Sequence, residues 1–187
     1  MQEEIIEKLR CAPAQIPRLD TCFETTSALR FWLFDPPNSK ARIEFLAKAK
    51  ALDVRCNTEF ERTLAAVDRC LISDEAQQKC DAILFWRARN KWQVYWIELK
   101  MNLTTQKEVN IAFSLFGEKE ALDQILNTRK ILEGAGLDCA SWANTYFIGI
   151  PPIQEKRVKK SPSLQRKREE LRRKDVFVFF GSVLALP

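Results

Sequence analysis

The chain has 187 residues, a formal net charge of +5 and no histidine. Without histidine, no Ser-His-Asp or Cys-His catalytic arrangement, no HExxH motif and no His-coordinated zinc can form, so any chemistry must use carboxylates, lysine, cysteine or a bound metal. The length predicts a single domain over residues 1–187, and a hydrophobic content of 46% is typical of a globular protein.

The N-terminal residues and the cysteines bear on where in the cell the protein is found. Residues 1–8 are acidic and contain no apolar core, so we expect no signal peptide, and no apolar stretch is long enough to predict a membrane span. The cysteines form no CxxC pair; they are Cys11, Cys22, Cys56, Cys70, Cys80 and Cys139. We therefore expect a cytoplasmic protein with reduced thiols, no structural zinc and no membrane partner.

The first third of the chain predicts short elements. Residues 1–10 have apolar side chains at helical spacing and predict a helix, and prolines then interrupt the chain around an apolar stretch at residues 29–34. Residues 39–52 also predict a helix. Residues 57–71 fit either a helix or a strand, and we favour a strand in their C-terminal half.

Two aromatic and β-branched runs in the middle of the chain predict a β-hairpin. They cover residues 80–86 and 92–100, with a polar segment between them. The elements expected after the hairpin are a helix at 119–133, a strand at 145–150, a basic helix at 164–174 and a strand at 176–186. This order predicts a mixed α/β or α+β domain.

The hairpin also brings charged side chains together. A turn at Arg89-Asn90 would place Asp81 directly opposite Glu98, with Cβ atoms about 4.5–5.5 Å apart, and alternation would put Lys100 on the same face. Two adjacent carboxylates repel each other, and Mg²⁺ with oxygen ligands would relieve that repulsion. The alternative is an ordinary surface ion pair between Glu98 and Lys100.

These residues resemble the active-site signature of the PD-(D/E)xK nuclease superfamily, which has the restriction-endonuclease-like fold. Asp81 is followed after sixteen residues by Glu98-Leu99-Lys100. The resemblance covers residues 64–150 and implies a mixed central sheet, flanked by helices, with a hairpin that carries the D…ExK motif. It also implies that Asp81, Glu98 and the Leu99 carbonyl bind Mg²⁺ (or Mn²⁺), and that Lys100 positions or activates water.

The resemblance extends to further residues. Gln124 stands in the following helix, as a glutamine does in many members, and would be a secondary residue of the catalytic site. Members of the superfamily often add an acid from an upstream helix, and here Glu44 and Glu59 both compete for that place. Residues 1–60 would form an N-terminal extension, and residues 154–187 a basic helix and a closing strand.

The positive charge is concentrated near the C-terminus. Residues 154–175 carry ten Lys or Arg and four acids, a net +6, so this segment accounts for the basic character of the whole chain. The predicted nucleic-acid-binding residues are Lys156, Arg157, Lys159, Lys160, Arg166, Lys167, Arg168, Arg172, Arg173 and Lys174. The alternative is a solvated helix face.

Together these features predict a metal-dependent nuclease that hydrolyses phosphodiester bonds, with DNA favoured over RNA as the substrate. Because many nucleases of the superfamily cut two strands as dimers, the resemblance also implies a homodimer as one arrangement. The alternative function is a catalytically silent module on the same fold that binds nucleic acid or another protein.

Overall fold

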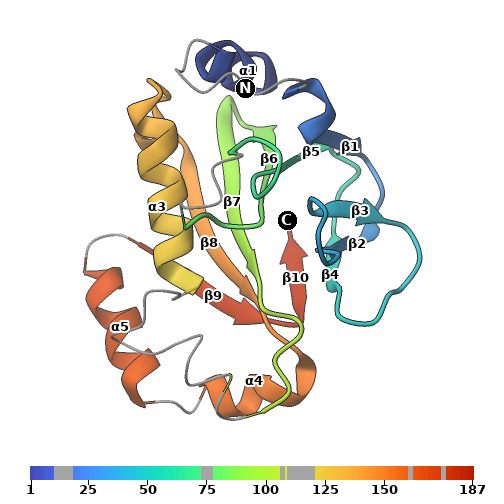
Figure 1. The fold of residues 1–187 in the computed structure, drawn as a ribbon, viewed down its shortest axis with the longest axis vertical. Coiled ribbons are helices and arrows are strands. Elements are labelled where there is room, and N and C mark those ends of the chain that lie inside the picture. The colour runs from blue at the N-terminus through green and yellow to red at the C-terminus, as the bar shows by residue number, and fades with distance from the viewer. Residues whose placement is uncertain (11–18, 73–77, 106–107, 109–120, 160–161, 174–175) are drawn as a thin grey trace.

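A computed structural model describes residues 1–10, 19–72, 78–105, 108, 121–159, 162–173 and 176–187, and these form an α+β fold on two sheets (Figure 1). The six-stranded sheet has the order β1 (Phe23–Thr26), β5 (Arg62–Ala66), β6 (Ala82–Ala88), β7 (Lys91–Leu99), β8 (Ala143–Gly149), β9 (Val178–Gly181). The four-stranded sheet has the order β10 (Val183–Leu186), β4 (Leu52–Cys56), β2 (Arg30–Phe34), β3 (Arg42–Glu44). The helices are α1 (Gln2–Arg10), α3 (Ala121–Gly134), α4 (Pro152–Lys159) and α5 (Pro162–Arg172), with 3₁₀ turns η1 (Leu19–Cys22) and η2 (Cys139–Ser141).

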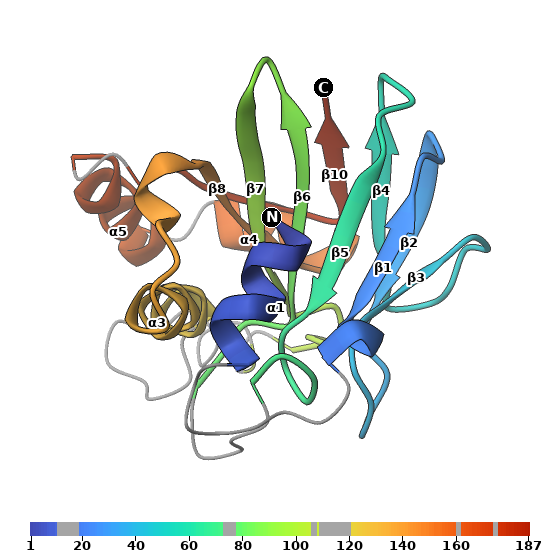
Figure 2. The same ribbon diagram turned by 90° about the horizontal axis from the view of Figure 1, so that it is seen from above.

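The six-stranded sheet lies between two hydrophobic cores. Helices α1 and α3 lie on one side of it, and the four-stranded sheet lies on the other (Figure 2). On one face, Ile5 of α1 and Ile125 of α3 pack in the same core as Trp96 of β7. On the other face, Phe31 of the four-stranded sheet packs in the same core as Leu84 of β6. Because both faces of the sheet are covered, its central strands β6 and β7 are mostly apolar.

The sheet is mixed, as expected. Strands β1, β5, β6 and β7 pair antiparallel, whereas β7, β8 and β9 pair parallel. A parallel pair needs a long crossover connection, and α3 lies within the connection between β7 and β8. The helix predicted at residues 119–133 is therefore confirmed over its described part, and the helix predicted at residues 1–10 is confirmed as α1.

The helix predicted at residues 39–52 is wrong. Ile43 lies in β3, where it pairs with Leu33 of β2, and Leu52 begins β4. Leu46 is 79% exposed, and Lys50 has a positive φ of 64° that interrupts a helix. Pairing with strands from other parts of the chain therefore overrides the helical spacing.

The predicted C-terminal strand at residues 176–186 is two strands in different sheets. β9 pairs with β8 of the six-stranded sheet, and β10 pairs with β4 of the other. At the crossing between them, the backbone N–H of Ser182 donates to a Glu155 carboxylate oxygen at 2.7 Å. Helix α4, which the sequence pattern missed, begins at Pro152, because proline is tolerated in the first turn of a helix.

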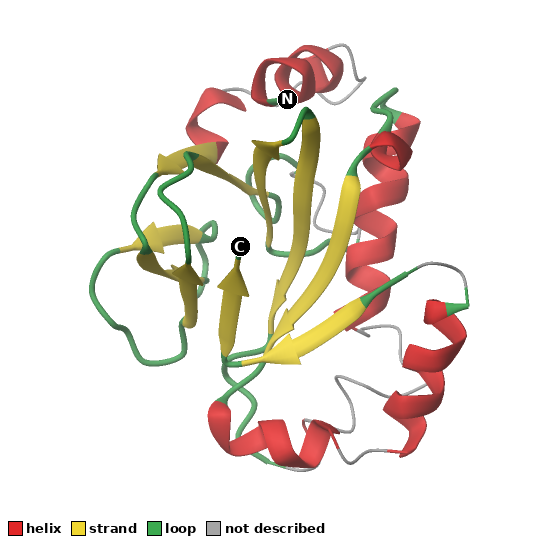
Figure 3. Ribbon diagram, turned by 180° about the vertical axis from the view of Figure 1, so that it is seen from behind, coloured by secondary structure: helices red, strands yellow, loops and turns green. Residues whose placement is uncertain are grey.

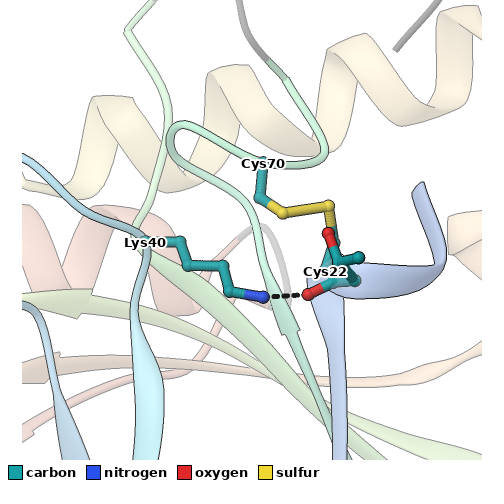
Figure 4. Close-up of a disulfide and its surroundings, with 4 residues drawn as sticks. Cys22, Lys40 and Cys70 are labelled. Atoms are coloured by element: carbon teal, nitrogen blue, oxygen red, sulfur yellow. Dashed lines mark hydrogen bonds between the residues drawn. A yellow bond between two sulfur atoms is a disulfide. The ribbon is translucent and has the colours of Figure 1, made fainter. Parts of the chain in front are cut away.

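A disulfide joins Cys22 at the end of η1 to Cys70 in the turn after β5, so the expectation of reduced thiols is wrong for this pair (Figure 4). The two cysteines are 48 residues apart in sequence, and the antiparallel pairing of β1 with β5 brings them together. The free cysteines of the described residues, all buried, are Cys56, Cys80 and Cys139. No helix in the described ranges is long and apolar enough to cross a membrane.

Candidate active site

The β6–β7 hairpin has the predicted register. Ala82 pairs with Ile97, and the pairing continues to Ala88 opposite Lys91. The turn residues Arg89 and Asn90 have φ of 49° and 61°, the left-handed conformation that a two-residue hairpin turn requires. The register therefore brings Asp81 and Glu98, the residues just beyond the Ala82–Ile97 pair, to the same end of the hairpin.

Glu98 is a buried carboxylate. It lies on the same face of β7 as Trp96, toward α3, and is 1% exposed. The ammonium of Lys100 forms an ion pair with its Oε1, while Oε2 has no hydrogen-bond partner among the residues described. The ion pair expected as a surface feature is thus a buried one, and a buried oxygen without a donor is costly to maintain.

Asp81 is held beside Glu98 by backbone contacts. Its Oδ2 accepts a hydrogen bond from the Leu99 N–H at 2.5 Å, and its carbonyl accepts one from the Val67 N–H at 2.9 Å. The preceding N–H, that of Cys80, donates to Thr128 Oγ1 at 2.8 Å. Strands β5 and β7 and helix α3 therefore all position the segment that carries Asp81.

Helix α3 places Gln124 at the same end of the hairpin. Lys100 Nζ donates to Gln124 Oε1 at 2.9 Å, so one lysine bridges the amide and the Glu98 carboxylate. One turn later, Thr128 Oγ1 donates to the Gln124 carbonyl at 2.8 Å while it accepts the Cys80 N–H. The sequence-predicted residues Asp81, Glu98, Lys100 and Gln124 are thus brought together.

Burial dominates the electrostatics of the site. Burial, reinforced by the charges of Glu98 and Asp35, raises the pKa of Asp81 well above its usual range. Burial also raises the pKa of Glu98 to about 7, although the Lys100 ammonium opposes this shift. For Lys100, burial lowers the pKa, but the neighbouring carboxylates raise it by more, so the ammonium stays charged at neutral pH.

Two acids that sequence reasoning missed lie near this site. Asp35, directly after β2, is close enough for its charge to raise the pKa of both Asp81 and Glu98. The charge of Asp68, just after β5, also raises the pKa of Glu98. Asp68 forms an ion pair with the buried Lys79 at 3.3 Å. The signal that could have found them is an acid within two residues of the end of an apolar strand.

The upstream acids predicted from the sequence lie elsewhere. Glu44 in β3 accepts hydrogen bonds from Arg42 at 2.7 Å and from Lys48 at 2.6 Å. Glu59 is exposed and precedes the first residue of β5. The last residue of β5, Ala66, pairs with Ala82, which directly follows Asp81. The expectation for Glu59 is corrected, because the antiparallel direction of β5 puts it at the opposite end of the strand from the carboxylates.

The donors at this end of the hairpin fit a hard divalent cation. Glu98 Oε2 has no hydrogen-bond partner in the described ranges, and the charge of Glu98 helps to raise the pKa of Asp81. The Lys100 ammonium lowers the pKa of each carboxyl but does not bring either back to its usual range. Within the described ranges, no three Cys, Asp or Glu side chains converge on a metal site by themselves. Mg²⁺, however, is commonly held by one or two carboxylates and keeps several waters.

Among the residues that the structure describes, the predicted nucleic-acid-binding residues lie on α4 and α5 (Figure 3), and Arg173 directly follows α5. Lys156, Arg166, Arg172 and Arg173 are exposed, and Arg168 is half-buried over the ring of Phe180 at 5.6 Å. The side chains of Arg157, Lys159, Lys160, Lys167 and Lys174 lie outside the described residues. The described part of the segment therefore presents mostly exposed positive charge.

Comparisons with known proteins find no match for this chain, whether by family model, by curated sequence or by solved structure.

Proposed function

We propose that this protein is a metal-dependent nuclease that hydrolyses phosphodiester bonds, with DNA as the favoured substrate. The observation that carries the proposal is Glu98, a buried carboxylate that lies beside Asp81, pairs with Lys100 and has one oxygen without a partner in the described part of the chain. We further propose that the mixed sheet, its β6–β7 hairpin and the crossover helix α3 constitute a restriction-endonuclease-like core.

In this proposal, Asp81, Glu98 and the Leu99 carbonyl hold Mg²⁺ or Mn²⁺. Such an ion, when bound, acts as a Lewis acid on a phosphate oxygen and lowers the pKa of a coordinated water. Lys100 acts as a cation and hydrogen-bond donor toward the negative charge that develops on the phosphate, because its raised pKa disfavours a role as a base. Gln124 orients the Lys100 ammonium through their hydrogen bond.

The basic helices supply the affinity for nucleic acid in this proposal. Lys156, Arg166, Arg172 and Arg173 are exposed and would contact phosphates, which position the substrate without reading its sequence. A cytoplasmic location and a homodimer that cuts two strands remain parts of the same proposal.

The test is cleavage of labelled single-stranded DNA, duplex DNA and RNA in Mg²⁺ and in Mn²⁺. Asp81→Asn, Glu98→Gln and Lys100→Met should each lower the cleavage rate by at least about 100-fold, because each removes a group that acts on the reacting phosphate. Glu61→Gln, which changes an exposed glutamate in the same way, is the matched control. Wild-type protein that cleaves none of the three substrates in either metal would contradict the proposal.

One observation favours a second candidate, a catalytically silent module that binds nucleic acid. Lys100 closes directly on Glu98 Oε1 and on Gln124, so part of the charge at the site is neutralised without an ion. A silent module would bind DNA in a salt-dependent manner, and Glu98→Gln would leave both its affinity and its lack of cleavage unchanged.

A further inference from the structure

A groove runs between helix α5 and the edge strand β9. It has a volume of about 360 Å³, which lies in the range of small-ligand sites, and residues that line it include Arg168, Glu169, Arg172, Val176, Phe177 and Phe179. Strand β9 is the last strand of the six-stranded sheet, and α5 lies beside it in both Figure 1 and Figure 3. The groove is therefore open along the sheet edge rather than enclosed in a core.

Two aromatic side chains on one side of this groove face solvent. Phe177 is 46% exposed and Phe179 is 48% exposed, whereas Val178 between them is buried. Alternation directs Phe180 to the buried side, where Arg168 covers its ring. Consecutive outward-facing positions thus carry phenylalanine, although a polar residue would suit an exposed face better.

The opposite side of the groove is cationic. Arg172 is exposed and Arg168 is half-buried, and both belong to the segment 154–175, whose net charge is +6. Glu169 is the one acid among the groove residues named above, so arginine predominates over carboxylate. An occupant that matches this surface has flat apolar faces on one side and negative charges on the other.

We infer that the groove binds single-stranded nucleic acid, with bases stacked on Phe177 and Phe179 and phosphates held by Arg168 and Arg172. Aromatic platforms combined with a basic groove are the means by which proteins hold single strands, because every base has a stacking face. A duplex keeps its bases stacked inside and cannot use the phenylalanine rings. This inference rests on the proposed function and specifies the form of its substrate.

The groove lies two strands away from the candidate active site in the six-stranded sheet. Glu98 pairs in register with Ile148 of β8, which pairs with Phe180 of β9. Since neighbouring strands are about 4.8 Å apart, the β9 backbone is roughly 10 Å from the Glu98 backbone. The β9 side of the groove therefore lies in the same sheet as Glu98, two strands away.

The test measures fluorescence anisotropy of a labelled mixed-sequence oligonucleotide, as a single strand and as a duplex, with the metal chelated so that nothing is cleaved. The double variant Phe177→Ala/Phe179→Ala should weaken single-strand binding by at least about 30-fold and leave duplex binding within about 2-fold, since each of the two stacked bases contributes about 1–3 kcal/mol. Phe45→Ala, at a phenylalanine that is 62% exposed elsewhere, is the matched control.

Two further variants test the chemistry of the contact. Phe179→Trp should retain single-strand affinity and Phe179→Leu should lose it, because leucine keeps apolar area but has no ring face. Arg172→Gln should reduce the dependence of log Kd on log salt by about 0.7, the value for one phosphate contact on a single strand. Circular dichroism checks that all variants are folded.

The outcomes separate the two proposals. Single-strand binding that depends on the phenylalanines, without cleavage in Mg²⁺ or Mn²⁺, supports the groove and rejects the nuclease. Cleavage by a protein whose single-strand affinity is unchanged in the double variant rejects the groove and leaves the nuclease. Absence of single-strand binding by the wild-type protein also overturns the inference, and would make an acidic protein partner the alternative occupant.

Discussion

Glu98→Gln should stabilise the metal-free protein at high pH, although it removes an ion-pair partner of Lys100. The pKa of Glu98 is raised from 4.5 to about 7 in the folded protein, mainly by burial. An acid whose folded pKa is raised contributes stability at a pH below its unfolded pKa and loses it as pH rises through the folded value. The wild-type protein should therefore lose stability between about pH 4.5 and pH 7.

The magnitude follows from the two pKa values. The rise in the pKa of Glu98 from 4.5 to about 7 lowers the unfolding free energy by about 3 kcal/mol at pH 8, where Glu98 is ionised in both the folded and the unfolded state. At pH 5 the loss of unfolding free energy is only about 1 kcal/mol. Glutamine resembles the protonated acid and has no such loss, so Glu98→Gln should be the more stable protein by about 3 kcal/mol at pH 8 and by about 1 kcal/mol at pH 5.

Urea unfolding in the presence of a chelator measures both values. Trp96, which is fully buried two residues before Glu98, makes tryptophan fluorescence a suitable probe. Glu4→Gln, at an exposed glutamate, is the control, and it should change the unfolding free energy only slightly and by the same amount at both pH values. A stability difference for Glu98→Gln that is the same at pH 5 and pH 8 would refute the reasoning, because it would not come from ionisation.

A divalent cation should largely cancel the stability difference between the two proteins at pH 8. A ligand that binds only the folded state adds about 2.7 kcal/mol at 100 times its dissociation constant. Mn²⁺ at pH 8 should therefore stabilise the wild type and leave Glu98→Gln nearly unchanged. Equal stabilisation of both proteins would mean that the ion binds elsewhere.

Three further predictions concern the surroundings of the site. Thr128→Val should lower the unfolding free energy by about 1–3 kcal/mol and slow cleavage, because the buried Cys80 N–H loses its acceptor, whereas Thr128→Ser should restore both. Asp35→Asn should shift the acid limb of the pH–rate profile to lower pH, because the Asp35 charge raises the pKa of Asp81 and Glu98; an unshifted limb would contradict this. Replacing Cys22 and Cys70 by serine should lower the unfolding free energy by about 2–4 kcal/mol, and adding a dithiol should do the same to the wild type but not to the variant.

The hairpin and α3 could be predicted because their determinants are local. The register depends on a two-residue turn at Arg89-Asn90 and on side chains that alternate over a few residues either side of it. Gln124 was added through the resemblance to the nuclease superfamily, and it lies on a helix face that also carries the buried Ile125 and Thr128. The meeting of Asp81, Glu98, Lys100 and Gln124 was therefore predictable, although their chemistry remains a proposal.

Features that depend on distant partners were missed. Residues 39–52 have the spacing of a helix, but pairing of β3 and β4 with β2 prevails over it. The segment 176–186 alternates as one strand would, and nothing in that alternation reveals that its two halves join different sheets. Neither the spacing nor the number of cysteines identified Cys22 and Cys70 as partners.

The sequence alone therefore determined the α+β class, the absence of histidine chemistry and a charged cluster at the end of one hairpin, since composition, turns and alternation are properties of short segments. The tertiary structure alone decided that Glu98 is buried with one oxygen that has no partner among the residues described, and that the charges of Asp35 and Asp68 raise its pKa. It also decided that Phe177 and Phe179 are exposed beside arginines. Burial and electrostatic proximity depend on which distant segments pack together, and this cannot be inferred from a local sequence pattern.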